Sequence, residues 1–260
     1  MTQTRIVVVI PTYNCESQIF STLTKVNFLA DFFDEVWIID NGSKDQTLRV
    51  AQSFIDGLSF QNDKFVLFQN RMNISLGGTS KVAFRMAVEK SFTHLLVVHG
   101  DDQANPKDFL SILTNPDQLG EKVSFFGSRF SLDSSLHGYR LERIFGNLVL
   151  NFIYSMFTFK FLTDLGSGLN LYNLKQLEEL DLSNLSNSMS FNYDLLLSFI
   201  AKDLEFKYIP ISWRESNQIS NAKNFKVFVE ALRILIRWRF NVFKKVVSTE
   251  FLEYPKRYKI

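Results

Sequence analysis

Two adjacent carboxylates and a histidine occur together where a short apolar run ends. Residues 97–106 read VVHGDDQANP, so His99, Asp101 and Asp102 share one glycine-containing turn. Like charges in such a turn repel each other, and a divalent cation would offset that repulsion. The alternative is an ordinary Asp-rich turn, in which Asp102 or Asn105 caps a following helix. The segment therefore predicts either a metal site or a helix cap.

The elements that would position this turn alternate along the first half of the chain. Strands are predicted at 6–10, 35–39, 64–68, 95–98 and 123–126, and helices at 16–29, 45–54, 79–90 and 106–113. Strands separated by helices of this length predict an α/β fold, with a mostly parallel sheet covered by helices on both faces. In such sheets, ligands bind beyond the carboxyl ends of the strands.

Polar residues follow every predicted strand. They are Pro11-Thr12-Tyr13-Asn14, Asp40-Asn41-Gly42-Ser43, Asn70-Arg71-Met72-Asn73, His99-Gly100-Asp101-Asp102 and Gly127-Ser128-Arg129. One such segment carries little information, because loops are polar by default. Five at one edge of a sheet predict a site for a phosphorylated sugar or a base.

Several of these residues have both a chemical and a structural interpretation. Asp40 could accept hydrogen bonds from a base or from ribose hydroxyls, or it could close an Asx-turn. Tyr13 could stack on a base or pack as a loop aromatic. Arg129 could clamp a diphosphate or form a surface salt bridge. The pair Gly77-Gly78 could offer free amides to a phosphate at a helix start, or serve a tight turn.

Composition narrows the classes of function. The chain has 260 residues, 46% of them hydrophobic, and a net charge of only +2, which argues against a nucleic-acid partner. The single cysteine, Cys15, permits no internal disulfide, and no Cys/His cluster predicts zinc, so a reducing cytosol is expected. No signal peptide and no apolar stretch of about 18 residues is evident.

The order of these segments is similar to that of a known family. VVVIPTYN, EVWIIDNGSKDQT, NISLGGTSKVAFRMA, VVHGDDQANP and FFGSRF resemble family 2 glycosyltransferases of GT-A fold, in the branch of dolichyl- and polyprenyl-phosphate sugar synthases. The resemblance is specific over residues 5–130 and looser as far as about residue 225. It implies a GT-A domain over residues 1–222, and the charges and apolar residues that follow predict a basic amphipathic helix and tail over residues 223–260.

The resemblance also implies roles for individual residues. The donor nucleotide and its diphosphate would be bound by Pro11, Thr12, Tyr13, Asp40, Gly42, Ser43, Asn73, Gly77, Gly78, Asp101, Gln103, Arg129 and Arg214. The family's DxD-type motif binds Mg²⁺ or Mn²⁺, and this chain reads His99-Gly100-Asp101 there. His ligates Mn²⁺ but is a poor Mg²⁺ ligand. Either both side chains bind the metal, or Asp101 holds it with the donor phosphates while His99 points elsewhere.

The second half of the chain carries the acceptor side of the resemblance. Two residues would be catalytic, the metal ligand Asp101 and Asp194. Asp194 stands where the family often has an acidic residue that takes part in catalysis. As a general base it would take a proton from an acceptor hydroxyl. A lipid-phosphate acceptor is already ionised and needs no base, so Asp194 could instead orient groups or lie on a helix surface. Asp164 and Ser167 in TDLGSG resemble an acceptor-side segment.

Two helices raise the question of a membrane. Residues 143–162 carry a polar stripe, Asn147, Asn151, Ser155 and Thr158, on an otherwise apolar helix. Because no basic residues flank that stripe, packing on the sheet or contact with a second copy of the chain is favoured over a position in a membrane interface. Residues 223–247 are basic, amphipathic and rich in Phe, which favours binding to an anionic membrane over docking on the domain.

The function expected from these observations is a metal-dependent glycosyltransferase, inverting by family inference. It would move a sugar from a nucleotide-sugar to a lipid-linked acceptor, a polyprenyl phosphate or lipid-linked glycan, in the synthesis of cell-surface polysaccharide or glycoconjugates. It would be a cytoplasmic protein attached peripherally to the inner face of the plasma membrane. The eroded metal motif motivates an alternative, a non-catalytic nucleotide-sugar-binding or scaffold subunit. A nucleotidyltransferase would need a Gly-rich loop after the first strand, which PTYNCES lacks.

Overall fold

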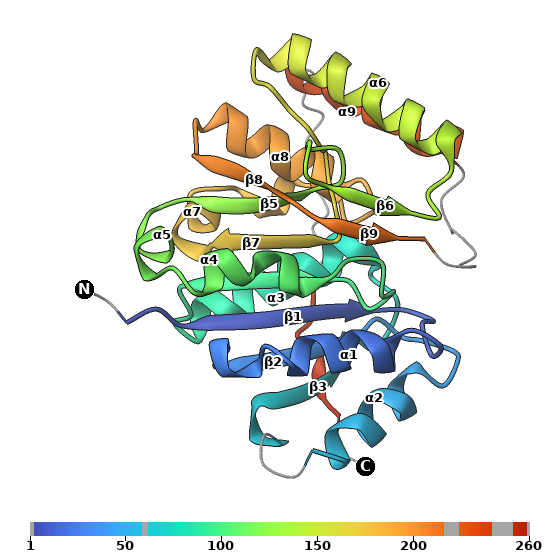
Figure 1. Ribbon diagram of the computed structural model, residues 1–260, viewed down its shortest axis with the longest axis vertical. Coiled ribbons are helices and arrows are strands. Elements are labelled where there is room, and N and C mark those ends of the chain that lie inside the picture. The colour runs from blue at the N-terminus through green and yellow to red at the C-terminus, as the bar shows by residue number, and fades with distance from the viewer. Residues whose placement is uncertain (1–2, 59–61, 216–223, 241–251, 259–260) are drawn as a thin grey trace.

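A computed structural model describes residues 3–58, 62–215, 224–240 and 252–258 of the chain. Its described strands form one sheet of eight and a separate pair (Figure 1). The sheet has the order β10 (Lys256–Arg257), β3 (Phe65–Gln69), β2 (Glu35–Asp40), β1 (Ile6–Thr12), β4 (His94–Val98), β7 (Leu169–Asn173), β5 (Ser124–Ser128), β8 (Phe206–Pro210). The pair consists of β6 (Ser135–His137) and β9 (Ser212–Arg214).

Side chains alternate between the two faces of this sheet, as the period of a strand requires. In β1, Val7 and Val9 belong to one hydrophobic core, and Val8 and Ile10 belong to the other. The first core is covered by α3 (Ser75–Glu89), α7 (Leu174–Glu178) and α8 (Phe191–Ala201). The second is covered by α1 (Ile19–Asn27), α2 (Thr47–Asp56), α4 (Leu110–Leu113) and α5 (Pro116–Gly120). Short 3-10 turns occupy Ala30–Phe32, Asn62–Lys64, Pro106–Phe109 and Leu182–Asn184.

Strand direction brings the predicted polar segments together. β1 is parallel to β2 and β4, and β2 is parallel to β3. β7 is antiparallel to both β4 and β5, so those two strands run the same way, and β8 is parallel to β5. The prediction of a mostly parallel sheet with its polar segments at one edge is confirmed. The reversed strands β7 and β10 were not predicted.

Two long helices lie side by side at one end of the molecule, α6 (Leu141–Thr158) and α9 (Asn224–Arg239) (Figure 1). The phenol of Tyr154 in α6 donates a hydrogen bond to the carbonyl of Ala231 in α9, at 2.7 Å. Ala231, Ile234 and Leu235 are buried in the first core. α9 therefore packs on the domain through its apolar side.

This packing corrects the prediction that the apolar face of residues 223–247 enters a membrane. Phe228 and Leu232, two residues of the apolar face expected to enter a membrane, pack against the core, as does Leu235. The structure instead shows the alternative, a helix that docks on the domain, as far as residue 239. Residues 223 and 241–247 lie outside the described part of the chain. Beyond them, β10 adds an antiparallel edge strand to β3.

No helix among the described residues is long and apolar enough to cross a membrane.

A buried histidine at the start of β4 predicts a loss of stability in acid. His94 is enclosed in the sheet beside Thr93 and Asn173, and burial lowers its pKa from 6.5 to about 4. The unfolded chain therefore binds this proton more tightly than the native protein. The stability that a neutral His94 contributes is present above pH 6.5 and is lost as pH falls towards 4.

We expect this residue alone to remove about 2 kcal/mol from the free energy of unfolding between about pH 7 and about pH 4.5. Urea denaturation of the wild type and of His94→Gln at both pH values isolates the effect, because all other titratable groups are the same in the two proteins. If the pH dependence of the two proteins is the same, His94 is not the titrating group.

Candidate active site

The loops after β1 and β2 are joined by hydrogen bonds around a buried carboxylate. Asp40 is enclosed, and its carboxylate accepts hydrogen bonds from the amides of Gly42 and Ser43 at 3.2 and 3.1 Å. The hydroxyl of Thr12 is also buried and donates to the carbonyl of Ile39. Asp40 thus closes the turn after β2, as its structural interpretation expected. Its contact with a nucleotide stays a prediction.

The rim of these loops remains open to solvent. Tyr13 is exposed, and Asn14 beside it joins the two loops. The amide of Asn14 donates to the Ser43 hydroxyl, and its side-chain oxygen accepts from the Lys44 amide, both at 2.9 Å. This leaves the ring of Tyr13 at the outside of a fixed loop, where a base could stack on it. Pro11 is half-buried near the end of β1.

Asn41 has a structural role that the sequence did not reveal. Its side chain donates to Asn73 and accepts from the amide of Ile74 and the side chain of Asn70, each at 2.9–3.0 Å. Asn73 in turn accepts from the amide of Ser75 at the start of α3. The side-chain oxygen of Asn73, predicted to bind the donor, therefore serves this network.

The glycine pair at the start of α3 corrects a prediction. The amides of Gly77 and Gly78 donate to the carbonyls of Ser188 and Asn187, at 3.3 and 3.1 Å. A Cβ at Gly77 would lie 2.4 Å from the carbonyl oxygen of Ser186, so only glycine fits. The prediction that these amides bind phosphate is therefore wrong, because both already donate hydrogen bonds to the segment of residues 186–188.

The turn after β4 separates its two carboxylates. Asp102 adopts a left-handed backbone (φ 61°), and its carboxylate forms an ion pair with Lys25 of α1 at 2.7 Å. The carboxylate of Asp101 accepts a hydrogen bond from the Gln103 amide instead. A Cβ at Gly100 would lie 2.6 Å from Thr12, so the turn must pass close to β1. Lys25 therefore offsets the repulsion between the two acids, and the role of Asp101 as a metal ligand stays a prediction.

Arg214 is brought next to this turn. Its amide donates to the carbonyl of Gln103 at 2.7 Å, while its side chain is exposed. The segment that carries Arg214 thus lies beside the acidic turn, although more than a hundred residues separate them in the sequence. A carboxylate for the cation and a guanidinium for the phosphates are the groups that a metal-bound diphosphate would contact.

His99 lies against the TDLGSG segment. Its amide donates to the carbonyl of Gly168, and a Cβ at Gly168 would lie 2.7 Å from Nδ1 of the ring. Burial lowers the pKa of His99, an effect that Asp101 opposes and the charge of Arg129 reinforces. The shift favours the neutral imidazole, which is the form that binds metals. Metal ligation by His99 stays a prediction.

Arg129 forms an ion pair, as its alternative interpretation expected, but a buried one. Its guanidinium binds both carboxylate oxygens of Asp164 at 2.8 Å and the carbonyl of Gly166 at 3.2 Å. Both side chains are almost fully buried, and the guanidinium lies over the ring of Trp213. This pair fixes residues 164–166 against the end of β5. Binding of a diphosphate by Arg129 remains a prediction.

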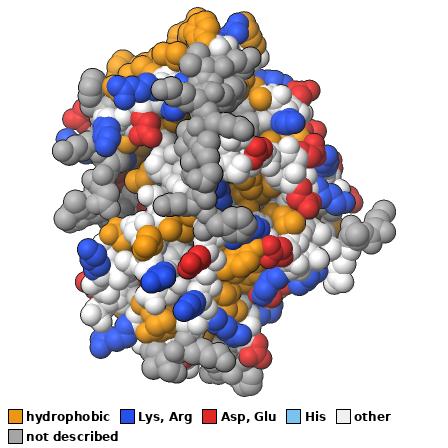
Figure 2. Space-filling view, turned by 180° about the vertical axis from the view of Figure 1, so that it is seen from behind, with side chains coloured by type: hydrophobic (Ala, Val, Ile, Leu, Met, Phe, Trp, Pro, Cys, Tyr) orange, Lys and Arg blue, Asp and Glu red, His pale blue; other side chains and the backbone are white. Residues whose placement is uncertain are grey.

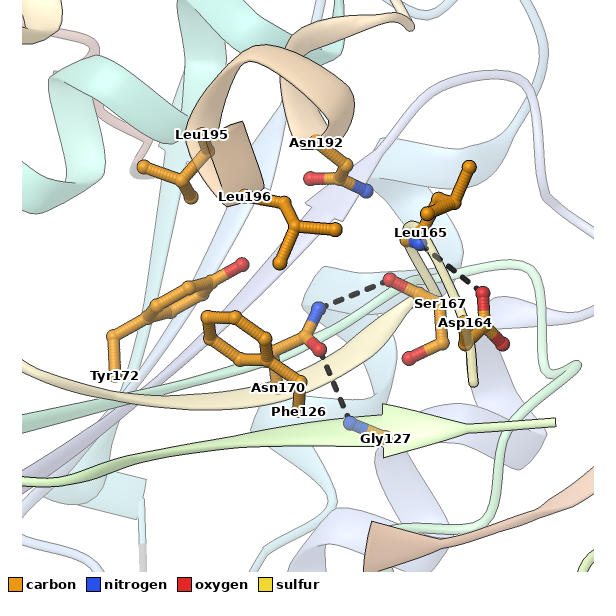
Figure 3. Close-up of a pocket in the computed structure, with 11 residues that line it drawn as sticks. Phe126, Gly127, Asp164, Leu165, Ser167, Asn170, Tyr172, Asn192, Leu195 and Leu196 are labelled. Carbon is orange, nitrogen blue, oxygen red and sulfur yellow. Dashed lines mark hydrogen bonds between the residues drawn. The ribbon is translucent and has the colours of Figure 1, made fainter. Parts of the chain in front are cut away.

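A small pocket lies beside Asp164, between β5, β7 and α8 (Figure 3). Asn170 of β7 bridges its wall, since it accepts from the Gly127 amide and donates to the Ser167 carbonyl. Asn192 of α8 faces the same pocket and packs against Gly166. Neither asparagine was predicted to line a pocket, although each interrupts an apolar run.

Asp194 lies in the first turn of α8. Its carboxylate accepts a hydrogen bond from the amide of Ser186 at 3.1 Å. Burial raises its pKa, against the lowering effects of that hydrogen bond, of Arg237 and of Lys81. Lys81 donates to the carbonyl of Leu185 and to Asn187, so both charged groups hold the segment that packs on α3. Its role as a base stays a prediction.

Known proteins are similar to this chain in sequence. The sequence profile of glycosyl transferase family 2 matches residues 7–180. UDP-N-acetylglucosamine–dolichyl-phosphate N-acetylglucosaminyltransferase of Methanococcus voltae is 26% identical over 183 residues, which are 67% of this chain and 72% of that protein.

Solved structures share the fold. Glucosyl-3-phosphoglycerate synthase of Mycobacterium tuberculosis, in complex with Mn²⁺, UDP and phosphoglyceric acid, matches with a TM-score of 0.66 and 16% identity, over 91% of this chain and 79% of that one. Mannosyl-3-phosphoglycerate synthase of Rubrobacter xylanophilus matches with a TM-score of 0.64 and 12% identity, over 95% and 78%.

Proposed function

Because the chain belongs to glycosyl transferase family 2, we propose that it moves a sugar from a nucleotide-sugar to a lipid-linked acceptor. The acceptor would be a polyprenyl phosphate or a lipid-linked glycan at the cytoplasmic face of the plasma membrane. The observation that carries this proposal is the edge of the sheet where Asp101, His99 and Arg214 converge. The Methanococcus voltae relative, whose name includes dolichyl phosphate, supports a lipid acceptor.

The residues at this edge fit a cation that the donor helps to bind. Among the described residues, no group of three or more His, Cys, Asp or Glu side chains could hold a metal. Asp101, with His99 as a second ligand, would leave the remaining positions to the diphosphate and water. A bound Mn²⁺ or Mg²⁺ would act as a Lewis acid on the departing diphosphate. The solvent-exposed side chain of Arg214 would bind the same phosphates.

The remaining residues would orient the two substrates. Tyr13 would stack on the base, and the loops closed by Asp40 and Ser43 would hold the ribose. An ionised lipid phosphate attacks the anomeric carbon without loss of a proton, so Asp194 would position the segment beside the acceptor. With a hydroxyl acceptor, Asp194 would be the group that takes the proton.

Isothermal titration of UDP, GDP and dTDP, each with EDTA, Mg²⁺ or Mn²⁺, tests the donor site. We expect one nucleotide to bind at least about tenfold more tightly with Mn²⁺ than with EDTA, because a cation neutralises the diphosphate beside Asp101. The matching sugar nucleotides are then incubated with polyprenyl phosphate, and the labelled lipid product is counted. Nucleotide binding without sugar transfer to any lipid acceptor would support a non-catalytic subunit, and no binding at all would contradict the site.

A further inference from the structure

α6 is built with its polar side inward and its apolar side outward. Asn151 donates to the carbonyl of Thr163, Asn147 donates to the Tyr139 phenol, and Ser155 accepts from the amide of Leu162. The polar stripe seen in the sequence thus faces the protein. A helix bordering water has the opposite arrangement.

The outward side is a continuous apolar surface. We call it the α6 outer face and define it by Leu141, Phe145, Leu148, Phe152, Met156 and Phe159. These residues recur at steps of three and four, and all are exposed, Phe145 by 70% and Phe152 by 65%. No charged residue occurs from Ile144 to Phe159. A surface of this kind on a single protein marks an interaction site.

Basic residues border this face, but they come from another helix. α9 lies beside α6 and exposes Lys226, Arg233, Arg237 and Arg239. Figure 2 shows hydrophobic side chains gathered at this end of the molecule, with Lys and Arg side chains beside them. The acid of α9, Glu230, is turned inward to the hydroxyl of Ser190 at 2.7 Å. The basic flank that the sequence of α6 lacks is therefore supplied by its neighbour.

We propose that the α6 outer face docks on an anionic lipid bilayer and enters its interface, with the basic side chains of α9 at the headgroups. An apolar face with a basic border is suited to a lipid bilayer. The phenylalanines can be buried among acyl chains, and the basic side chains are attracted to anionic headgroups. A second copy of the chain would match the apolar face but would bring its own basic residues against these.

The inner side of the same helix contacts the segment that leads to Asp164. Asn151 binds the carbonyl of Thr163, the residue before Asp164 of the buried ion pair. A helix is about 10–12 Å wide, so a lipid held at the outer face would have its phosphate close to this segment. This last step rests on the proposed function, whereas binding to a bilayer does not.

Flotation of the full chain with vesicles tests the proposal. The probes are phosphatidylcholine vesicles with and without phosphatidylglycerol. The test variant is Phe145→Gln/Phe152→Gln, and the matched control is Phe20→Gln/Phe28→Gln, whose rings are 58% and 68% exposed on α1 and just after it. All four rings lie at the surface, so thermal unfolding should be unchanged in both variants.

We expect the wild type and the control to float with the anionic vesicles, and the α6 variant to partition at least about tenfold more weakly, since two large apolar side chains no longer leave water. Equal partitioning of the three proteins, or no binding by the wild type, would overturn the proposal. So would sedimentation showing a wild-type dimer that only the α6 variant dissociates, because a second copy would then cover the face.

A separate assay keeps this result distinct from the proposed function. Sugar transfer to a short, water-soluble prenyl phosphate should be equal in the wild type and the α6 variant, while transfer to a long acceptor in vesicles should fall in the variant. If no acceptor is glycosylated, the proposed function fails, and flotation still decides whether the face binds lipid.

Discussion

Asp101→Asn lowers the rate of sugar transfer by at least about a thousandfold, or about 4 kcal/mol in transition-state stabilisation, if Asp101 holds the metal. Asn keeps the size of the side chain but removes the charge that would face the cation. Initial rates at saturating donor, with Mn²⁺, measure the effect. Titration of the nucleotide should show at the same time that Mn²⁺ no longer strengthens its binding, while binding in EDTA is unchanged.

The neighbouring acid provides the matched control. Asp102 differs from Asp101 by one position in the sequence, but its carboxylate pairs with Lys25. We expect Asp102→Asn to change the rate by less than about fivefold, since a partly exposed ion pair is worth little. If Asp102→Asn instead abolishes transfer and Asp101→Asn does not, the metal site has been assigned to the wrong carboxylate.

The second large effect is on stability and concerns the ion pair between Arg129 and Asp164. Arg129→Met should lower the free energy of unfolding by about 3–5 kcal/mol, because it leaves the buried carboxylate of Asp164 without its cation. Urea denaturation at neutral pH measures the loss. The double variant Arg129→Met/Asp164→Asn should recover most of it, since no charge is then buried alone and the amide oxygen can still accept a hydrogen bond from the backbone amide of Gly166.

The same variants separate the two interpretations of Arg129. If Arg129→Met has the free energy of unfolding of the wild type but a much higher KM for the donor, the guanidinium of Arg129 binds the diphosphate and the ion pair contributes little to stability. A loss of stability that the double variant restores, with the KM for the donor little changed, assigns it to holding residues 164–166 in place.

Local sequence was sufficient for the framework of the site. Apolar runs such as Ile6–Ile10 and Glu35–Ile39 predicted strands because burial on both faces of a sheet requires them. The carboxyl ends of those strands have to share an edge in a parallel sheet, and this alone places Asp40 and Asp101 on the same side of the domain. Each of these inferences depends on residues that are close in the sequence.

Partners distant in the sequence could not be predicted in this way. The amide of Gly77 meets Ser188, and Arg129 meets Asp164, across stretches of chain whose path no local pattern defines. The order of β4, β7 and β5 is a similar case, because Leu169–Asn173 reads as a buried strand in either direction. As a result, groups predicted to bind phosphate were found to be used in packing.

The helices show the limit most clearly. The sequence by itself determined that α6 and α9 each have a polar and an apolar side, because that follows from a period of 3.6 residues. Only the tertiary structure decided which side faces out. α9 buries its apolar side on the core, whereas α6 buries its asparagines against Thr163 and Tyr139 and exposes its phenylalanines. The orientation of a helix is set by what it packs against, and that surface is assembled from residues elsewhere in the chain.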